Sequence, residues 1–289
     1  MKLRSAAIKL YSCVFGRTTG LISDRTYTRT LYYLSFGCLP NLEQPKKFSE
    51  HICAIKLSDD TLAYREYADK YEVRRFVARE LGESYLIPML GVYKSFDEIP
   101  FADFPKQFVL KATHASGYNV IVRDKDQLNL SAVRRKFRKW LKKEYYLVGR
   151  EKNYKNIRPR ILAEPFLDFG STLREYKIFC FHGQVRMICV HCFDEKGRTV
   201  TTFDPDWNRL DVTMGYPAAA SMPKPKELTE LLNCARILSA PFPFVRVDMY
   251  ANDGQVLFSE LTFTPGGGIQ HVEPKEYDAI MGSWFEQES

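Results

Sequence analysis

The sequence has no apolar run long enough to cross a membrane, because no segment approaches the roughly 20 apolar residues of a spanning helix. Residues 1–16 also lack the uninterrupted apolar core of a secretory signal, since Lys9 interrupts it. The seven cysteines have no regular spacing, which argues against a disulfide framework. These absences predict a protein of a reducing compartment, and we expect it to be cytoplasmic.

The common phosphate-binding motifs are missing as well. Lys111 ends a predicted strand and precedes a small-residue loop, 112–119, whose N–H groups could face phosphate oxygens. No Gly-Lys-Ser/Thr follows, so the loop is not a Walker loop. Nor do the HRD and DFG elements of a protein kinase follow it. A surface lysine beside a turn remains the alternative interpretation.

What is present indicates a folded, basic protein. The 289 residues are 45% hydrophobic, enough for two or three lobes around a good-sized core. A net charge of +7 favours acidic partners such as nucleotides or anionic polysaccharides. Leu3, Ala7, Leu10 and Val14 share one face of a predicted helix, which either packs as the first helix of the domain or lies on anionic lipid.

The stretch from Phe244 to Gly268 predicts a β-hairpin that carries two carboxylates. A three-residue loop, 252–254, would place Arg246 opposite Glu260 and make Asp248 and Glu260 diagonal neighbours on one face. Carboxylates in this arrangement suit Mg²⁺ that is also held by phosphates. The alternative is an ion pair of Arg246 with either acid on a solvated face. The residues predicted to face the core are Val245, Val247, Met249, Leu257, Leu261 and Phe263.

Three further segments, in a predicted helix and in two predicted strands, carry charged residues. Lys70 lies within a helical pattern over 60–81, and Glu164 precedes Pro165 at the end of a strand. Lys177 shares a strand face with Phe179, so its charge needs an anion to meet it.

A helix predicted from Ser131 to Tyr145 has one strongly basic face. This face either docks a polyanion or is simply solvated. No aromatic residues interleave with its charges, so we expect no nucleic-acid partner. Cys189 and Cys192, three residues apart on a strand, face opposite sides and cannot bind one metal.

The order of these parts resembles the ATP-grasp superfamily, and its details resemble the TupA-like branch, the teichuronopeptide and polysaccharide-biosynthesis ligases. The resemblance runs from about Pro45 to the C-terminus. It rests on PKKFSE (45–50), ADKYEVR (68–74), FVLKATHASG (108–117), LAEPFL (162–167), EYKIFCF (175–181), RVDMY (246–250) and ELTFTPGGG (260–268).

The resemblance implies an α+β ATP-grasp fold with a small lid lobe, a larger C-terminal antiparallel-sheet lobe and a reduced helical N-terminal region. The implied divisions are 1–58 for the helical region and 59–105 for a helical and linker part of the core. Residues 106–165 would form the lid, and 166–289 the subdomain that binds metal and ATP.

The resemblance also assigns roles to residues. ATP phosphates would be held by Lys70, Lys111 and the lid loop, including His114, Ser116 and Gly117. Glu164, Pro165, Phe166 and Leu167 would border the adenine. Asp248 and Glu260 would bind Mg²⁺. Lys177 would face phosphate or substrate, and Arg246 would lie near the transferred phosphoryl group. Thr262 stands where many ATP-grasp enzymes carry Asn.

The function implied is an ATP- and Mg²⁺-dependent carboxylate–amine ligase that works through an acyl phosphate. Its partners would be an acidic sugar or polysaccharide precursor and an amine or amino acid, with peripheral contact at the inner face of the membrane left open. Catalysis of this kind depends on charge neutralisation and positioning, so it needs no Ser–His or Cys–His pair. The alternatives are a kinase of a polysaccharide precursor and a nucleotide- or glycan-binding subunit without turnover.

Overall fold

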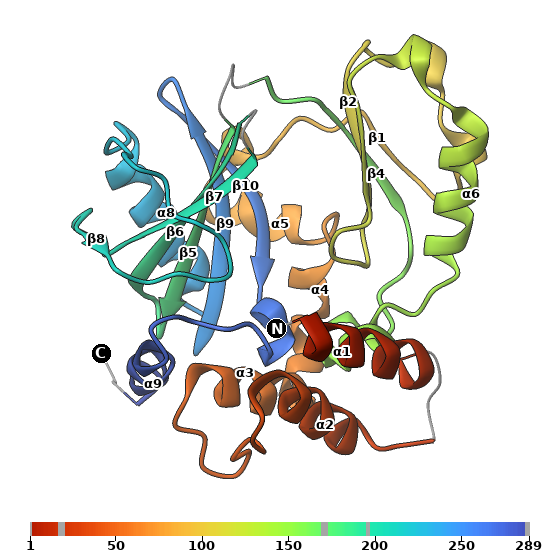
Figure 1. Ribbon diagram of the computed structural model, residues 1–289. Coiled ribbons are helices and arrows are strands. Elements are labelled where there is room, and N and C mark those ends of the chain that lie inside the picture. Colours follow the sequence, from red (N-terminus) through yellow and green to blue (C-terminus); the bar gives the residue numbers. More distant parts are fainter. Residues whose placement is uncertain (1, 17–20, 169–172, 195–196, 287–289) are drawn as a thin grey trace.

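Two antiparallel sheets and a set of helices make up the molecule (Figure 1). The computed structural model describes residues 2–16, 21–168, 173–194 and 197–286. Helices α1 (Lys2–Phe15), α2 (Asp24–Phe36) and α3 (Phe48–Leu57) lie at the bottom of the view, below the sheets. The expected α+β class is confirmed.

The larger sheet has six strands in the order β10-β9-β5-β6-β7-β8, and each neighbouring pair is antiparallel. Short turns connect β5 to β6 and β9 to β10, as the sequence pattern predicts. The strands are β5 (Leu173–Phe181), β6 (Gln184–Asp194), β7 (Gly197–Phe203), β8 (Arg209–Leu210), β9 (Phe244–Asn252) and β10 (Gln255–Thr262).

Helices cover both faces of this sheet. On one face, α5 (Val73–Glu80) and α8 (Leu228–Ser239) pack against buried side chains that include Ile178, Val245 and Val247. On the other face, α3 and α9 (Glu276–Ser283) cover only the end near Phe179 and Phe244. Cys189 and Cys192 belong to these two opposite cores, as predicted. The remainder of the second face carries the charged residues described below.

The smaller sheet has the order β1-β4-β2-β3 and carries α6 (Leu130–Leu141) on one face. Val133 and Phe137 of α6 are buried against Leu110 and Ala163 of the sheet, because apolar residues recur every three to four positions along this helix. Asn129, not Ser131, caps α6 by accepting a hydrogen bond from the N–H of Ala132. The strands are β1 (Gly91–Tyr93), β2 (Phe108–Ala112), β3 (Asn119–Val122) and β4 (Ile161–Pro165).

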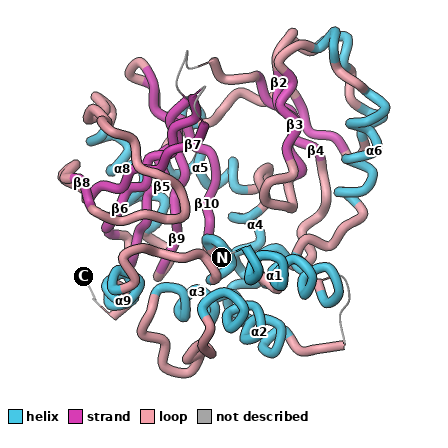
Figure 2. The backbone as a smooth tube through the Cα atoms, viewed as in Figure 1, coloured by secondary structure: helices cyan, strands magenta, loops and turns pink. Residues whose placement is uncertain are grey.

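The helical pattern over 60–81 does not form one helix, contrary to the prediction. A 3₁₀ segment over Asp59–Tyr64, α4 (Arg65–Ala68) and α5 are separate, and Asp69 has an extended backbone with ψ 118°. Figure 2 shows α4 and α5 as short separate segments between the two sheets. The break frees the N–H of Lys70 to donate to the carbonyl of Thr113, so tertiary contact overrides the local pattern.

The N-terminal helices are tied to the region around α7 (Tyr146–Gly149). Arg150, buried and with a positive φ of 57°, forms an ion pair with Asp24 at 3.3 Å and donates to the carbonyl of Phe15. Leu10 and Val14 of α1 remain exposed, so contact with lipid stays a prediction. None of the helices in the described ranges is both long and apolar enough to span a membrane.

Candidate functional site

The β9–β10 hairpin positions the two carboxylates by a route that differs from the prediction. Its turn has two central residues, Asp253 and Gly254, whose φ values of 49° and 81° are both positive, as a tight hairpin turn requires. Gln255 therefore lies opposite Asn252 rather than Ala251. The predicted three-residue loop and its register are wrong.

A bulge in β10 places Glu260 on the same face as Asp248, which the shorter turn alone would not do. Phe258 pairs with Met249, but Glu260 pairs with Asp248, so Ser259 is the extra residue. Without the bulge Glu260 would point to the opposite face, into the core, because successive strand residues alternate. The two carboxylates do share one face, as directly paired rather than diagonal neighbours. Of the residues predicted to face the α5–α8 core only Leu257 lies elsewhere, and Val256 and Phe258 take part instead.

Asp248 lies at the centre of a buried cluster of charges. Its carboxylate is 0% exposed and accepts hydrogen bonds from Arg246 Nε and Nη2, both at 2.6 Å. Lys177 Nζ lies 2.5 Å from Asp248 Oδ2 and 3.0 Å from Glu175. The anion that Lys177 requires is therefore supplied by the chain itself. The alternative ion pair of Arg246 with Asp248 is present, but it is buried rather than solvated.

Burial and charge act in opposite directions on the pKa values of this cluster. Burial by itself would raise the pKa of Asp248, but Arg246 and Lys177 outweigh it and hold that pKa below its ordinary value. Burial would lower the pKa of Lys177, yet Asp248 reverses that effect and raises it. For Glu175, burial dominates and raises the pKa. Arg246, Lys177 and Asp248 are thus all charged near neutral pH.

Glu260 is less firmly held than Asp248. Its carboxylate is 27% exposed and, among the described residues, has only long contacts: 3.4 Å to the hydroxyl of Thr262 and 3.7 Å to both Arg246 and Lys70. Two paired carboxylates of which one is weakly engaged fit an oxygen-ligated cation such as Mg²⁺ that takes its other ligands from phosphates. No group of three or more His, Cys, Asp and Glu side chains gathers as a metal site within the described residues.

Lys111 and Glu164 meet on the face of the smaller sheet that α6 does not cover. Lys111 Nζ lies 2.6 Å from Glu164, and Arg74 of α5 lies 3.6 Å from the same carboxylate. Glu164 is 5% exposed, so the ion pairs offset the cost of burying its charge. Lys111 has the predicted place beside the lid loop, but its charge is shared with an acid of the same sheet.

Beyond Ala163, β4 no longer pairs with β1. β1 pairs with β4 only as far as Ala163, so along Glu164 and Pro165 the described ladder continues with β2 alone. A backbone edge left open in this way can bond the edge of a ring. The N–H of Phe166, however, donates to Gln107 at 3.4 Å, and Arg123 lies 4.8 Å from the centre of the Phe166 ring. The N–H of Phe166 is therefore not free to bond a ligand.

Lys70 contacts both the lid loop and Glu260. Its Nζ donates to the carbonyl of Ala115 at 2.7 Å and lies 3.7 Å from Glu260. The lid loop itself is exposed at Ser116 and at Gly117, whose φ is 73°. One lysine thus contacts both the predicted phosphate loop and a predicted metal ligand.

The side chain of His114 has a different place from its neighbours in the loop. It is buried, and its Nε2 forms a hydrogen bond with the carbonyl of Trp140 in α6 at 3.1 Å. Burial lowers the pKa of the ring, so the imidazole is neutral near pH 7. The side chain therefore anchors α6, and only the backbone of His114 belongs to the lid loop.

The structure adds residues that sequence reasoning did not single out. Glu175 and Arg74 complete the two charge clusters, and Arg160 joins Asp69 at 2.7 Å beside Lys70. Glu175 precedes Lys177 by two residues, so strand alternation alone could have placed it on the same face. No local pattern marks Arg74 or Arg160, because their partners lie about 90 positions away in the chain.

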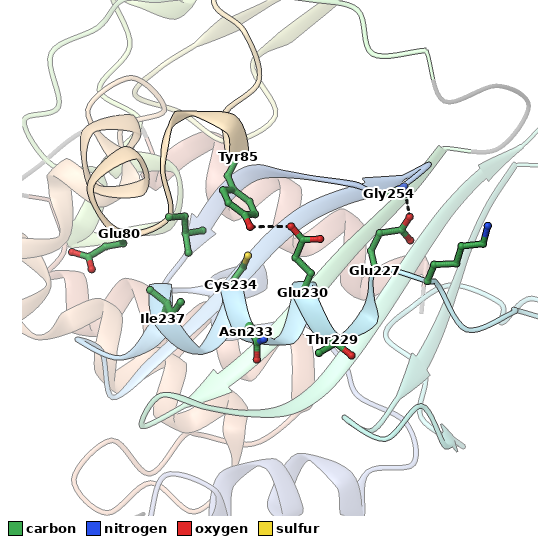
Figure 3. Close-up of a pocket in the computed structure, with 11 residues that line it drawn as sticks. Glu80, Tyr85, Glu227, Thr229, Glu230, Asn233, Cys234, Ile237 and Gly254 are labelled. Carbon is green, nitrogen blue, oxygen red and sulfur yellow. Dashed lines mark hydrogen bonds between the residues drawn. The ribbon is translucent and has the colours of Figure 1, made fainter.

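The larger cavities lie away from these charges. One of about 520 Å³ opens between α8 and Tyr85, on the other side of the six-stranded sheet (Figure 3). There Tyr85 donates to Glu230 at 2.9 Å and the N–H of Gly254 donates to Glu227 at 2.6 Å. The charged clusters around Asp248 and Glu164 therefore do not line the larger cavities.

Comparison with protein families finds one match that spans most of the chain. The family model for TupA-like ATP-grasp proteins matches residues 50–286. A comparison with curated proteins finds no match.

Solved structures resemble the chain at a distance. A D-alanine–D-alanine ligase from Helicobacter pylori is 14% identical with a TM-score of 0.41, over 76% of this chain and 58% of that one. The same enzyme from Bacillus anthracis is 19% identical with a TM-score of 0.44, over 83% and 66%. The ATP-grasp ligase PsnB, solved with Mg and ADP, is 10% identical with a TM-score of 0.42, over 77% and 60%. The chain thus covers less than two thirds of each of these proteins.

Proposed function

The chain belongs to the TupA-like ATP-grasp family, and from this premise we propose that it is an ATP-dependent carboxylate–amine ligase. The observation that carries the proposal is the convergence of Lys70, Lys177 and Arg246 on the paired carboxylates Asp248 and Glu260, beside the lid loop. Cations and oxygen ligands in one place match what phosphoryl transfer requires.

The proposed reaction has two steps. A substrate carboxylate attacks the γ-phosphate of ATP and gives an acyl phosphate and ADP. An amine then attacks the acyl carbon, loses a proton and displaces inorganic phosphate, so that an amide forms.

The charged residues have distinct parts in this reaction. Lys70, Lys111 and the N–H groups of the lid loop neutralise the phosphates, and Lys111 exchanges its contact with Glu164 for one with phosphate. Arg246 and Lys177 stabilise charge on the transferred group. Asp248 and Glu260 would hold Mg²⁺, which would supply Lewis-acid polarisation of the phosphate oxygens. The open edge of β4 at Glu164 and Pro165, with Leu167 just beyond the strand, borders the adenine.

Release of ADP tests the function directly. With ATP and Mg²⁺, purified protein is expected to release ADP only when both an acidic sugar, such as glucuronate or galacturonate, and an amine are present. Equal release without amine would favour a kinase. Retained ATP binding without ADP release across the whole panel would favour a subunit that only binds.

The basic outer face of α6 supports the proposal of an acidic substrate, here an acidic sugar or polysaccharide precursor. Arg134 and Arg138 form ion pairs with Asp97 at 2.8 and 3.0 Å. The remaining cations on the outer face of α6 and just beyond it, Arg135, Lys136, Lys139 and Lys142, are exposed. The apolar face of α6 is buried against the sheet, so the helix presents charge without apolar anchors for a membrane.

Charge reversal tests this surface. A variant with Arg135→Glu, Lys139→Glu and Lys142→Glu is expected to bind polygalacturonate about tenfold or more weakly, because the local attraction for polyanions is lost. The control reverses three exposed lysines elsewhere, Lys46, Lys224 and Lys275, and changes the net charge equally. Equal weakening in both variants, measured by titration at low and at 0.3 M salt, would show that only net charge matters.

A further inference from the structure

A row of polar side chains continues beyond the two carboxylates. Thr262 accepts a hydrogen bond from Arg246 at 3.0 Å and lies 3.4 Å from Glu260. Two residues later Thr264, 3% exposed, donates to the carboxylate of Glu151. The row therefore leads from the site of phosphoryl transfer to a further carboxylate, which lies in a segment of the chain outside the family's resemblance motifs.

Glycines leave the space that this carboxylate occupies. A Cβ at Gly149 would lie 2.3 Å from Glu151 Oε1, so a side chain there would displace the carboxylate. A Cβ at Gly267 would lie 3.8 Å from the same oxygen. Gly267 has a φ of 59°, and its carbonyl accepts a hydrogen bond from Lys56 at 2.7 Å. The backbone of the glycine run is thus fixed within reach of Glu151.

Aromatic rings and an amide surround Glu151 on the side of the lid. Tyr145 and Tyr154 pack edge to face with ring centres 4.9 Å apart, and Asn153 is 1% exposed beside Thr264. Tyr118, next to Gly117 of the lid loop, packs against Tyr145 at 5.4 Å. The carboxylate is therefore deep, yet Glu151 keeps partial contact with solvent.

Glu151 differs from Asp248, Glu164 and Glu175 in its partners, and it shares with the buried Asp278, which accepts hydrogen bonds from Ser49, the lack of an ion pair among the described residues. Asp248, Glu164 and Glu175 each pair with a lysine of their own sheet. Glu151 has no ion pair among the described residues, and it accepts a hydrogen bond from the neutral hydroxyl of Thr264. Burial raises the pKa of Glu151, and the hydrogen bond from Thr264 and the nearby charge of Lys56 lower it only in part, so a cost of the deep charge remains. A cationic ligand would remove that cost.

We infer that Glu151 binds the ammonium group of the amine substrate. The inference rests on the proposed ligase function, whose second substrate must reach the acyl phosphate beside Glu260 and Arg246. An amine held at Glu151 lies at the next position along the row, beside Gly267, whose missing side chain leaves space next to Glu151 Oε1. Glu151 is thus a residue of the amine subsite, separate from the groups that handle ATP.

Glu151→Gln tests the inference, because it keeps the shape and the acceptor for Thr264 while it removes the charge. Two reactions are compared. Hydroxylamine, which is neutral at pH 7.5, traps the acyl phosphate formed from glucuronate or galacturonate as a hydroxamate. Ligation is measured with alanine, glutamate, lysine and ethanolamine. We expect hydroxamate formation within about twofold of wild type and a KM for the amine raised about ten- to a hundredfold, as loss of a charged hydrogen bond implies.

Control variants separate binding from structure. Glu144→Gln removes an exposed carboxylate of the neighbouring segment and is expected to change neither reaction. Should Glu151→Gln not fold, Glu151→Asp carries the test, since it withdraws the charge by one methylene and is expected to raise the amine KM with trapping unchanged. An unchanged amine KM, or equal loss in both reactions, overturns the inference. Absence of hydroxamate with wild-type protein instead overturns the proposed function.

Discussion

Lys111→Ala is expected to lower amine-dependent ADP release by about a hundredfold to a thousandfold, the usual effect of removing one group that stabilises transition-state charge. The reason lies in the place of Lys111 at the end of β2, beside the lid loop. Initial rates at saturating ATP measure the effect. The control is Lys106→Ala, which removes a lysine of the same lobe whose side chain is 68% exposed.

The loss must be separated from a loss of stability, because Lys111 also neutralises Glu164. Without Lys111, the nearly buried Glu164 keeps only Arg74, at 3.6 Å. A double variant, Lys111→Ala with Glu164→Gln, is expected to regain most of the stability, since removing both partners costs less than removing one. Its ADP release should stay low. A normal rate in either variant would show that Lys111 does not hold phosphate.

Asp248→Asn is expected to abolish turnover and to reduce the free energy of unfolding by about 3–5 kcal/mol, the effect of breaking a buried ion pair. Arg246 and Lys177 both bond to this carboxylate. The substitution therefore removes the charged partner that these two buried cations share. Urea denaturation at pH 7 measures the loss. Asp206→Asn, at an exposed loop position, is the control and should change stability by less than about 0.5 kcal/mol.

The same pair of proteins tests the pKa of Asp248. In the folded state that pKa is lower than in the unfolded chain, where it is about 3.9. The stabilisation is therefore fully present above about pH 4 and is lost as the pH falls through the lower, folded-state value. The difference in stability between wild type and Asp248→Asn should stay constant from pH 7 to 5 and shrink as the pH falls below about 4. A difference that does not change with pH would contradict this assignment.

Much of the fold and of the candidate site can be predicted from the sequence because the relevant patterns are local. Alternation of apolar and polar residues places Asp248 and Arg246 on one strand face and Val245 and Val247 on the other. The spacing of Val133 and Phe137 predicts the buried face of α6. The order of short motifs then indicates the family, which the match over residues 50–286 confirms.

Other features depend on contacts that no local pattern contains. The bulge at Ser259 keeps Glu260 out of the core, and the position of a bulge follows from pairing and packing of the whole sheet. The break before Lys70 exchanges helix hydrogen bonds for one with Thr113, more than 40 positions away in the chain. The side chain of His114 forms a hydrogen bond with the carbonyl of Trp140 in α6, 26 positions away in the chain.

The sequence by itself determined the class of the fold, the two hairpins and the charged residues of the candidate site other than Glu175, Arg74, Arg160 and Glu151. The tertiary structure decided how those charges are paired: Lys177 with Asp248, Lys111 with Glu164, and Glu151 with a neutral hydroxyl. The physical reason is that strand and helix patterns depend on neighbours a few residues apart. The partner of a buried charge is set by the three-dimensional arrangement of segments that lie tens of residues apart.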